Sequence, residues 1–438
     1  MRKLASMIIC VLAAFPASAG APWTLKQCID YALEHNLTVR QSELSAAQKE
    51  IALNTAESRR LPAASANASQ NFSFGRGLTA DNTYANTNTT STGLNLGADM
   101  TLFNGFQIKN NILLGKLDLA AATVDLEKAR DDIRVAVAQA YIQVLYDKEI
   151  LSVARNQVEL DSLQVERLVE MERQGKTSRA EVAAQKATLA QSRSTAVQAE
   201  GTLSMALLDL SQLLELPSPE GFDVAFPEPE SLQVRLLPSP EDVYADAVAI
   251  KPVIEAEKIR LDYAKTNIEL AKGAFLPSLS LSGGIGSNYY TSSGRGSASF
   301  YDQMKNNFSQ YVGLSLSVPI FSRFSNRNNL RTAQLSLKSQ EIQLENTKKS
   351  LYKEIQQAYY SAVAAQQKYL GNEAALESAM EAFELMLAKC INGKATLTEL
   401  NESKNRMVEA SSNFARARYE NLYQTVLLDF YRGEALDF

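Results

Sequence analysis

The hydrophobic positions along this chain change their spacing in the same order in each half. Apolar residues first recur at helical spacing, over about 25–60 and again over about 240–275, and this pattern predicts a helix in each segment. Apolar residues then alternate with polar or small ones, which predicts strands with one apolar face and one polar face. Seven-residue spacing follows, and it predicts long helices that pack along their length.

Each half contains two candidate strands, within the segments 63–103 and 278–321. The alternation is clearest over 94–102 and 312–320. Loops are expected near 76–91 and 289–308. Strands of about ten residues with two unlike faces suit an outer-membrane barrel. The alternation alone is equally typical of a soluble hairpin.

The seven-residue spacing covers two proline-free segments, about 106–172 and 324–390. A helix of this length is roughly 100 Å long, and it must pack along its length as a coiled coil. A returning helix is expected in each half, over about 178–216 and 395–432. The first and the returning helix together match the long helix in length. The pattern therefore predicts a helical cylinder with strands at one end.

The two halves are copies of one another. A shift of 215 residues places Leu61-Pro62 on Leu276-Pro277, and a shift of 218 places Gly175-Lys176 on Gly393-Lys394. The predicted division is a first repeat at 20–216, a connection at 217–240 and a second repeat at 241–438. The connection holds six of the twelve prolines, so it is expected to be extended and partly β rather than helical.

Residues 1–19 have the features of a signal peptide. Arg2 and Lys3 give a positive start, an apolar core follows, and small residues end at Ala19, where cleavage is expected. No later apolar run reaches the roughly 18 residues that a transmembrane helix needs. The chain is therefore expected to be exported and to contain no transmembrane helix.

Composition argues against several function classes. The formal net charge is −5 and the basic residues are scattered, unlike those of a nucleic-acid binder. The single histidine and the two cysteines after the leader form no close grouping, so no metal site is predicted. No phosphate-binding loop or nucleophile motif is present. We therefore expect neither an enzyme nor a bound cofactor.

Two strands in each half make four in the chain, and four strands do not close a barrel. In lipid, the open edges would expose unpaired backbone groups, each costing several kcal/mol. Closure must therefore come from other subunits, and a sheet built from three chains would have twelve strands, enough to enclose a channel.

Four motifs together resemble the TolC family of outer-membrane efflux proteins. They are Leu-Pro-x-Leu-Ser-Leu-Ser-Gly at 276–283, Val-Pro-Ile-Phe at 318–321, Gly-Lys-Ala-Thr-Leu-Thr-Glu-Leu-Asn-Glu at 393–402 and Ala-Arg-x-x-Tyr at 415–419. The resemblance covers essentially the whole chain after the leader. It implies a mainly α, α+β membrane protein: a homotrimer with a 12-stranded β-barrel in the outer membrane, a helical barrel in the periplasm and a mixed equatorial domain that includes the connection.

The same resemblance implies a function and a set of partners. The protein is expected to be the passive exit duct of a tripartite efflux pump or a type I secretion system. Its partners would be a periplasmic adaptor (a membrane fusion protein), an inner-membrane transporter and outer-membrane lipid. A periplasmic adaptor or helical scaffold is the alternative, because such proteins also carry long helical hairpins, although they lack the repeated strand pair.

The resemblance also assigns residues at the far end of the helices. Glu399 and Glu402 occupy the positions of the acidic pore aperture, although a solvated helix face explains them as well. The turns at Gly175-Lys176 and Gly393-Lys394 are the expected docking tips for the adaptor. Cys390 and Ala395 stand where the family often has an aromatic residue and an arginine that latch the aperture, so closure here is expected to use other contacts.

Overall fold

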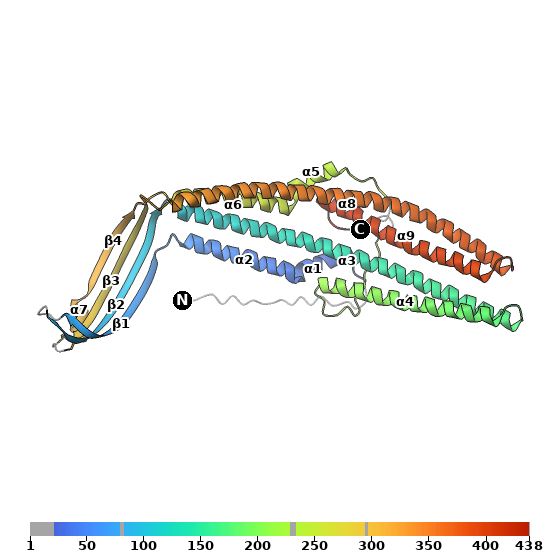
Figure 1. Cartoon of the computed structure of the whole chain (residues 1–438), viewed down its shortest axis with the longest axis horizontal. Helices are drawn as coiled ribbons and strands as arrows, with labels where there is room; N and C mark the ends of the chain where they lie inside the picture. Colours follow the sequence, from blue (N-terminus) through green and yellow to red (C-terminus); the bar gives the residue numbers. More distant parts are fainter. Residues whose placement is uncertain (1–21, 79–82, 228–233, 294–296, 438) are drawn as a thin grey trace. The chain divides into compact units, whose positions relative to one another are not determined.

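The computed structural model describes residues 22–78, 83–227, 234–293 and 297–437 (Figure 1). The predicted signal peptide at 1–19 lies outside the described residues, as does part of the connection, 228–233. The described chain is mainly helical with four antiparallel strands, which confirms the predicted fold class.

Helices and strands follow the same order in both halves, with one additional helix, α7, in the second. The first half contains α1 Leu25–His35, α2 Leu37–Ser58, β1 Ala63–Leu78, β2 Tyr84–Asn104, α3 Gln107–Arg173 and α4 Arg179–Leu213. The second half contains α5 Pro240–Ile250, α6 Pro252–Gly273, β3 Ser278–Ser292, α7 Phe300–Asn306, β4 Ser309–Ser317, α8 Ser325–Ile391 and α9 Leu397–Tyr431.

The repeat extends to individual backbone angles. The long helices α3 and α8 both have 67 residues, and the returning helices α4 and α9 both have 35. Most residues with positive φ form pairs that lie 218 positions apart in the sequence. These pairs are Gly105 with Arg323, Phe106 with Phe324, Gly175 with Gly393 and Glu215 with Gly433. The duplicated sequence therefore specifies duplicated turns as well as duplicated helices.

The first helix of each half is interrupted, so the predictions of one helix over 25–60 and one over 240–275 were wrong. Asn36 has an extended backbone. Its side chain accepts a hydrogen bond from the Thr38 N–H (2.8 Å) and donates one to the Leu213 carbonyl (3.0 Å). Lys251 is extended because the next residue is Pro252, which disfavours helical geometry in the residue before it.

The sheet has the order β1-β2-β3-β4, and every neighbouring pair is antiparallel (Figure 1). Strands β1 and β2 pair without interruption from Ala63–Asp99 to Leu78–Tyr84. The predicted loop at 76–91 is therefore mostly strand. Its Ser, Thr and Asn residues are common in turns, but here those within β2 each lie opposite a residue of β1. Conversely, β4 ends at Ser317, before the predicted 321, since Pro319 has no N–H to donate to a ladder.

The compact units of the fold do not coincide with the sequence repeats. One unit comprises Met1–Glu43, Asp125–Glu255 and Thr347–Phe438, and the other comprises Leu44–Val124 and Ala256–Asn346. Each unit takes segments from both halves. The predicted division into 20–216 and 241–438 describes the duplication, whereas packing joins corresponding parts of the two copies.

The first unit contains the hydrophobic core, and the connection is attached to it. Buried Tyr141 of α3 donates its hydroxyl proton to the carbonyls of Trp23 (2.9 Å) and Ala225 (2.6 Å). Lys148 donates to the Val224 carbonyl at 2.9 Å. Trp23 and Val224 form an isolated parallel β-bridge. The described start of the connection is thus extended and joined by β-pairing to the segment before α1.

In the second unit, the turn from β2 into α3 passes very close to the end of α6. Gly105 has φ +64°, and a Cβ built on it would lie 2.2 Å from the Gly273 carbonyl oxygen. A Cβ on Gly273 would in turn lie 2.4 Å from the Gly105 carbonyl oxygen. Both glycines are therefore required for the backbones to approach, and Gly105 is also required for its left-handed conformation.

We predict opposite effects for two glycine-to-alanine changes. Gly105→Ala should lower the apparent melting temperature, because left-handed alanine costs roughly 1–2 kcal/mol and its Cβ meets the backbone of Gly273. Gly201→Ala should raise it slightly, because Gly201 lies inside α4 with no atom within 4 Å of a Cβ and alanine is about 1 kcal/mol better in a helix. Thermal circular dichroism of the purified protein tests this; shifts of the same sign would contradict it.

Candidate functional site

The sheet has two chemically different faces. Directly paired residues share a face, so the register extends the alternation of each strand across all four. One face is almost entirely apolar: Ala64, Ala66 and Ala68 of β1, Leu94, Leu96, Ala98 and Met100 of β2, Leu279, Leu281, Gly283 and Ile285 of β3, and Val312, Leu314 and Leu316 of β4. The other face carries serine, asparagine and glycine, with Asp99 and Tyr311 among them.

The apolar face is exposed. Val312 is 83% exposed, Leu314 69% and Leu96 51%. A soluble antiparallel sheet buries its apolar face against a core and leaves the polar face in water. This sheet instead leaves its apolar face exposed, and the arrangement suits a sheet whose apolar face lies in lipid.

Aromatic residues flank the apolar band at both ends. Near the helices, Phe103 packs edge-to-face on Phe106 (centroids 5.2 Å apart), and their repeat counterparts Phe321 and Phe324 pack in the same way (5.6 Å). The distal end carries a second set of aromatic residues: Phe72, Phe74 and Tyr289. Tyr289 lies ten positions after Leu279 on β3. At about 3.3 Å per residue and the tilt near 40° that is usual for outer-membrane strands, this gives an apolar band about 25 Å tall, the height found in outer-membrane barrels.

The tips of the helical hairpins are built by capping motifs. Gly175 and Gly393 have φ of 71° and 69°. The N–H groups of Lys176 and Lys394 return to the carbonyls of Met171 (2.9 Å) and Lys389 (2.8 Å), five residues earlier. This is the Schellman pattern at a helix C-terminus. The four predicted docking residues therefore form two equivalent turns, and their lysines are exposed.

Glu399 caps the helix that follows the second tip. Its carboxylate accepts hydrogen bonds from the N–H (2.7 Å) and the hydroxyl (2.8 Å) of Thr396, and its own N–H donates to the Thr396 hydroxyl. The Thr396 N–H lowers the pKa of the Glu399 carboxyl below its usual range. Glu181, the counterpart at the first tip, is held by Thr177 and Ser178 in the same way, and its pKa is also lowered. Both carboxylates therefore stay charged at neutral pH.

Glu402 has a different partner. Its carboxylate lies 3.1 Å from the Arg406 guanidinium, one helical turn away, and both side chains are exposed. Glu402 and Glu399 are three residues apart on the first turns of α9, so the structure places both predicted aperture residues at one helix N-terminus. Each already has a local partner, which sequence reasoning missed.

A buried polar network joins the first hairpin to α9. Asp161 of α3 pairs with Lys404 of α9, and their side chains are 1% and 5% exposed. Gln185 of α4 donates to Asp161 at 3.1 Å and accepts from Asn401 at 3.0 Å, and the Ser192 hydroxyl also donates to Asp161. The only sequence signal was a charged residue three positions after Val158, where a heptad expects an apolar side chain.

The network occurs once although the hairpins are duplicated. The counterpart of Asp161 is Ala379, and the counterpart of Lys404 is Lys186, which is exposed. The two hairpins therefore share a scaffold but differ in buried charge. Within one chain, this ion pair fixes α9 to the first hairpin.

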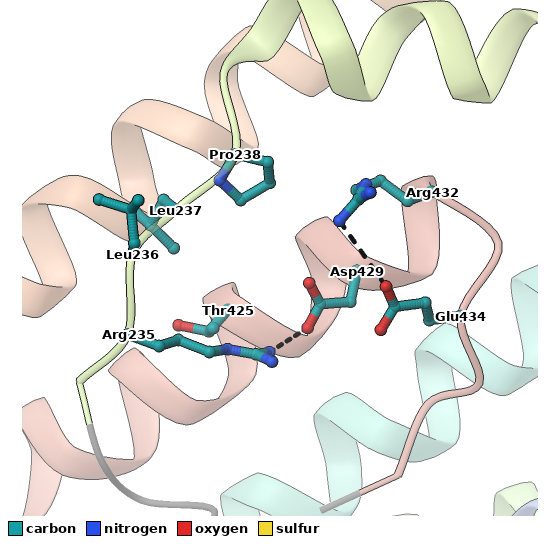
Figure 2. Close-up of a pocket in the computed structure, with 8 residues that line it drawn as sticks. All are labelled: Arg235, Leu236, Leu237, Pro238, Thr425, Asp429, Arg432 and Glu434. Atoms are coloured by element: carbon teal, nitrogen blue, oxygen red, sulfur yellow. Dashed lines mark hydrogen bonds and ion pairs between the residues drawn. The ribbon is translucent and has the colours of Figure 1, made fainter.

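A small cavity of about 240 Å³ lies between the end of the connection and α9 (Figure 2). Arg235 pairs with Asp429. Burial raises the pKa of the Asp429 carboxyl above its usual value, and the charge of Arg235 offsets part of that rise. Arg432 pairs with Asp246 (3.2 Å) and lies 3.7 Å from Glu434. Both guanidinium groups have carboxylate partners, so we interpret the cavity as the place where the connection is fastened to α9.

The described residues contain no further group that points to metal or membrane-helix chemistry. No three His, Cys, Asp or Glu side chains there come together as a metal-binding group. None of the helices described is both long and apolar enough to cross a bilayer. Cys28 and Cys390 are free thiols, and burial raises the pKa of Cys28 to about 12.

Comparison with known proteins gives consistent matches. A model of the family described as outer membrane efflux protein matches residues 28–215 and 243–434. The outer membrane efflux protein BepC of Brucella suis is 23% identical over 357 residues, 80% of this chain and 73% of BepC. Outer membrane protein TolC of Escherichia coli is 24% identical over 365 residues, 75% of this chain and 72% of TolC. The resemblance seen in the motifs is confirmed.

A solved structure agrees on the fold. The open-state MtrE outer membrane channel of Neisseria gonorrhoeae aligns with a TM-score of 0.74 at 22% identity, covering 94% of this chain and 89% of that chain. At this identity the likeness establishes the fold alone.

We predict that Lys404→Met destabilises the protein, whereas Lys186→Met at the equivalent exposed position has little effect. Removing one partner of a buried ion pair typically costs about 3–5 kcal/mol, because the other charge stays buried. Adding Asp161→Leu to Lys404→Met should recover most of the loss. Apparent melting temperatures from circular dichroism measure all three; equal shifts for the two lysine variants would contradict a structural role for the pair.

Proposed function

We infer the function of this chain from the family to which it belongs, the outer membrane efflux protein family, together with its two-faced sheet. The protein is an exit duct of the outer membrane for efflux or secretion. Its sheet belongs to the outer membrane and its helices to the periplasm.

The single observation that carries the proposal is the exposed apolar face of the sheet. Val312, Leu314 and Leu96 lie on it and are exposed, and the polar face carries the groups that suit a water-filled lumen. The apolar band has the height of an outer-membrane hydrocarbon layer and aromatic residues at both ends. A protein that stayed in the aqueous periplasm would gain nothing from this arrangement.

We propose that the duct is a homotrimer. Among the described strands, β1 and β4 each have a single neighbour, and such edges need partners in lipid. The helices also carry exposed apolar residues seven positions apart: Leu37, Leu44 and Ile51 on α2, and Leu335 and Ile342 on α8. Three copies would close a twelve-stranded barrel and cover these stripes by coiled-coil packing.

The alternative, a periplasmic adaptor or helical scaffold, is supported by the long hairpins alone. It leaves the apolar sheet face unexplained. Membrane fractionation and gel electrophoresis separate the two. The duct predicts a heat-modifiable oligomer in the outer-membrane fraction, whereas a soluble periplasmic monomer would contradict it.

We propose that the tips dock a periplasmic adaptor, which in turn joins an inner-membrane transporter. The turns at Gly175-Lys176 and Gly393-Lys394 support this, because they are exposed and nearly identical in backbone. Two equivalent turns in each chain would present six similar sites in a trimer. A partner built from repeated hairpins matches such a surface.

We propose that Glu399 and Glu402 of three copies form acidic rings at the periplasmic aperture. Rings of carboxylates favour cations in a pore. Glu399 is held at the start of α9 by its capping bonds, so substituting it also removes a cap. Glu402 makes no capping bond and is therefore the cleaner probe of the ring.

In planar bilayers, we predict that Glu402→Gln lowers cation selectivity and that Arg406→Gln raises it. The reason is that Arg406 lies 3.1 Å from Glu402 and offsets part of its charge. Glu409→Gln, an exposed change one heptad further from the tip, is the control and should have a smaller effect. Reversal potentials in a salt gradient measure the selectivity. Unchanged potentials for both Glu402→Gln and Arg406→Gln would remove the aperture assignment.

A further inference from the structure

The short helix α7 lies at the distal end of β3, where β4 is absent. Strand β4 begins its pairing with β3 at Ser309–Gly286, whereas β3 continues to Ser292. The last residues of β3 therefore have an edge that no strand described here covers. Helix α7 lies in the segment between β3 and β4, and sequence patterns assigned that segment to a loop.

Amide side chains from α7 and the residue after it take the place of the missing strand. Asn307 donates its side-chain N–H to the Asn288 carbonyl at 2.7 Å. The Gln303 amide accepts from the Tyr290 N–H and donates to the Tyr290 carbonyl, both at 3.0 Å. These are the bonds that a neighbouring strand would make, two residues apart along β3. The helix is therefore fixed to the sheet by three ladder-like hydrogen bonds.

Contacts with β3 also determine the face on which α7 lies. The Ser287 hydroxyl donates to the Met304 carbonyl at 2.6 Å, and the Tyr289 ring packs edge-to-face on Phe300 with centroids 5.1 Å apart. Ser287 pairs with Leu94 in the sheet register, so both contacts are made from the apolar face. Helix α7 therefore lies against the distal end of that face.

The exposed side of α7 has the composition of a membrane interface. Phe300 is 50% exposed and Tyr301 is 75% exposed. At 100° per residue, Phe300, Met304 and Tyr301 form one arc of the helix, and exposed Lys305 follows at its margin. Aromatic rings with a basic residue beside them are typical of segments at the level of lipid headgroups.

We propose that α7 is a lipid-interface anchor: it holds the distal rim of the sheet at the headgroup region of the outer leaflet. Tyr301 and Phe300 would insert among the headgroups, and the Lys305 ammonium would reach an anionic phosphate. The lipid is favoured over a protein partner because the aromatic arc is continuous with the apolar sheet face. The inference rests on the proposed function, which places that face in lipid.

Single-tryptophan fluorescence tests this assignment directly. The chain has one tryptophan, Trp23, and Trp23→Phe keeps an aromatic ring against Tyr31 and Phe222. In this background, Tyr301→Trp introduces the probe at a side chain that is 75% exposed. The full-length protein is reconstituted into anionic phospholipid vesicles containing lipids brominated near the headgroup.

Two matched positions on β4 calibrate the measurement. Leu314→Trp lies on the apolar face and Tyr311→Trp on the polar face. We expect lipid bromine to quench Tyr301→Trp and Leu314→Trp about twofold more than Tyr311→Trp. Bromine near the headgroup should quench Tyr301→Trp more strongly than Leu314→Trp, and bromine deep in the acyl chain should quench Leu314→Trp more strongly. Acrylamide in the water should quench Tyr311→Trp most strongly of the three.

The outcomes separate the inference from the function on which it rests. If lipid bromine quenches Leu314→Trp while only acrylamide quenches Tyr301→Trp, the anchor is overturned and the duct is not. Absence of lipid quenching at Leu314→Trp would overturn the placement of the sheet itself. Lys305→Glu is then added to the Tyr301→Trp variant. Loss of the lipid quenching of Trp at position 301 would support the phosphate contact of Lys305, and unchanged quenching would contradict that contact.

Discussion

Backbone hydrogen bonding in lipid is the constraint on which the rest of this structure depends. Every N–H and carbonyl of a strand in the hydrocarbon region needs a protein partner. Among the described strands, β1 pairs with β2, β2 with β3 and β3 with β4, so one edge of β1 and one edge of β4 have no neighbour. In the proposed homotrimer, the outer edges of β1 and β4 are paired by other copies. The same constraint explains why the end of β3 has partners: beyond the point where β4 begins, Gln303 and Asn307 provide hydrogen bonds to Tyr290 and Asn288.

The helical part of the chain depends on contacts between side chains and the backbone of distant segments. In the first unit, Tyr141 and Lys148 hold the connection against α3 through backbone carbonyls, so an extended segment is fixed without becoming a strand or helix. The duplicated turns reuse one set of capping geometries. Against this symmetric scaffold, the buried Asp161–Lys404 pair occurs in one place only. Replacing buried ion pairs with apolar residues often stabilises proteins, so we associate this pair with specific packing of α9 on the first hairpin.

Much of the fold was predictable because its strongest signals are periodic. Helix α3 was expected at 106–172 and lies at Gln107–Arg173, since a long heptad between a glycine-containing turn and a strand leaves little freedom. The tips were predictable for a local reason: glycine followed by a capping Ser or Thr and a glutamate three residues later ends one helix and begins the next.

The misses were positions where tertiary contacts decide local structure. Asn36 breaks a helix because Leu213, far away in sequence, offers a carbonyl. The strands β1 and β2 extend through polar residues because their backbones pair with each other along the whole segment. Helix α7 and the bonds of Gln303 depend on where β4 begins, at Ser309, which leaves the last residues of β3 without a neighbouring strand on that side. The buried partner of Asp161 lies 243 residues away, and a heptad pattern contains no information about that pairing.

Cysteine scanning of β4 in proteoliposomes tests the central claim, that one face of the sheet lies in lipid and the other in water, most directly. The native Cys28 and Cys390 would first be replaced by serine, and single cysteines introduced along 311–316. The account predicts that a water-soluble maleimide labels positions 311, 313 and 315 and leaves 312, 314 and 316 unlabelled. Equal labelling of both sets, or labelling of the apolar set alone, would contradict it.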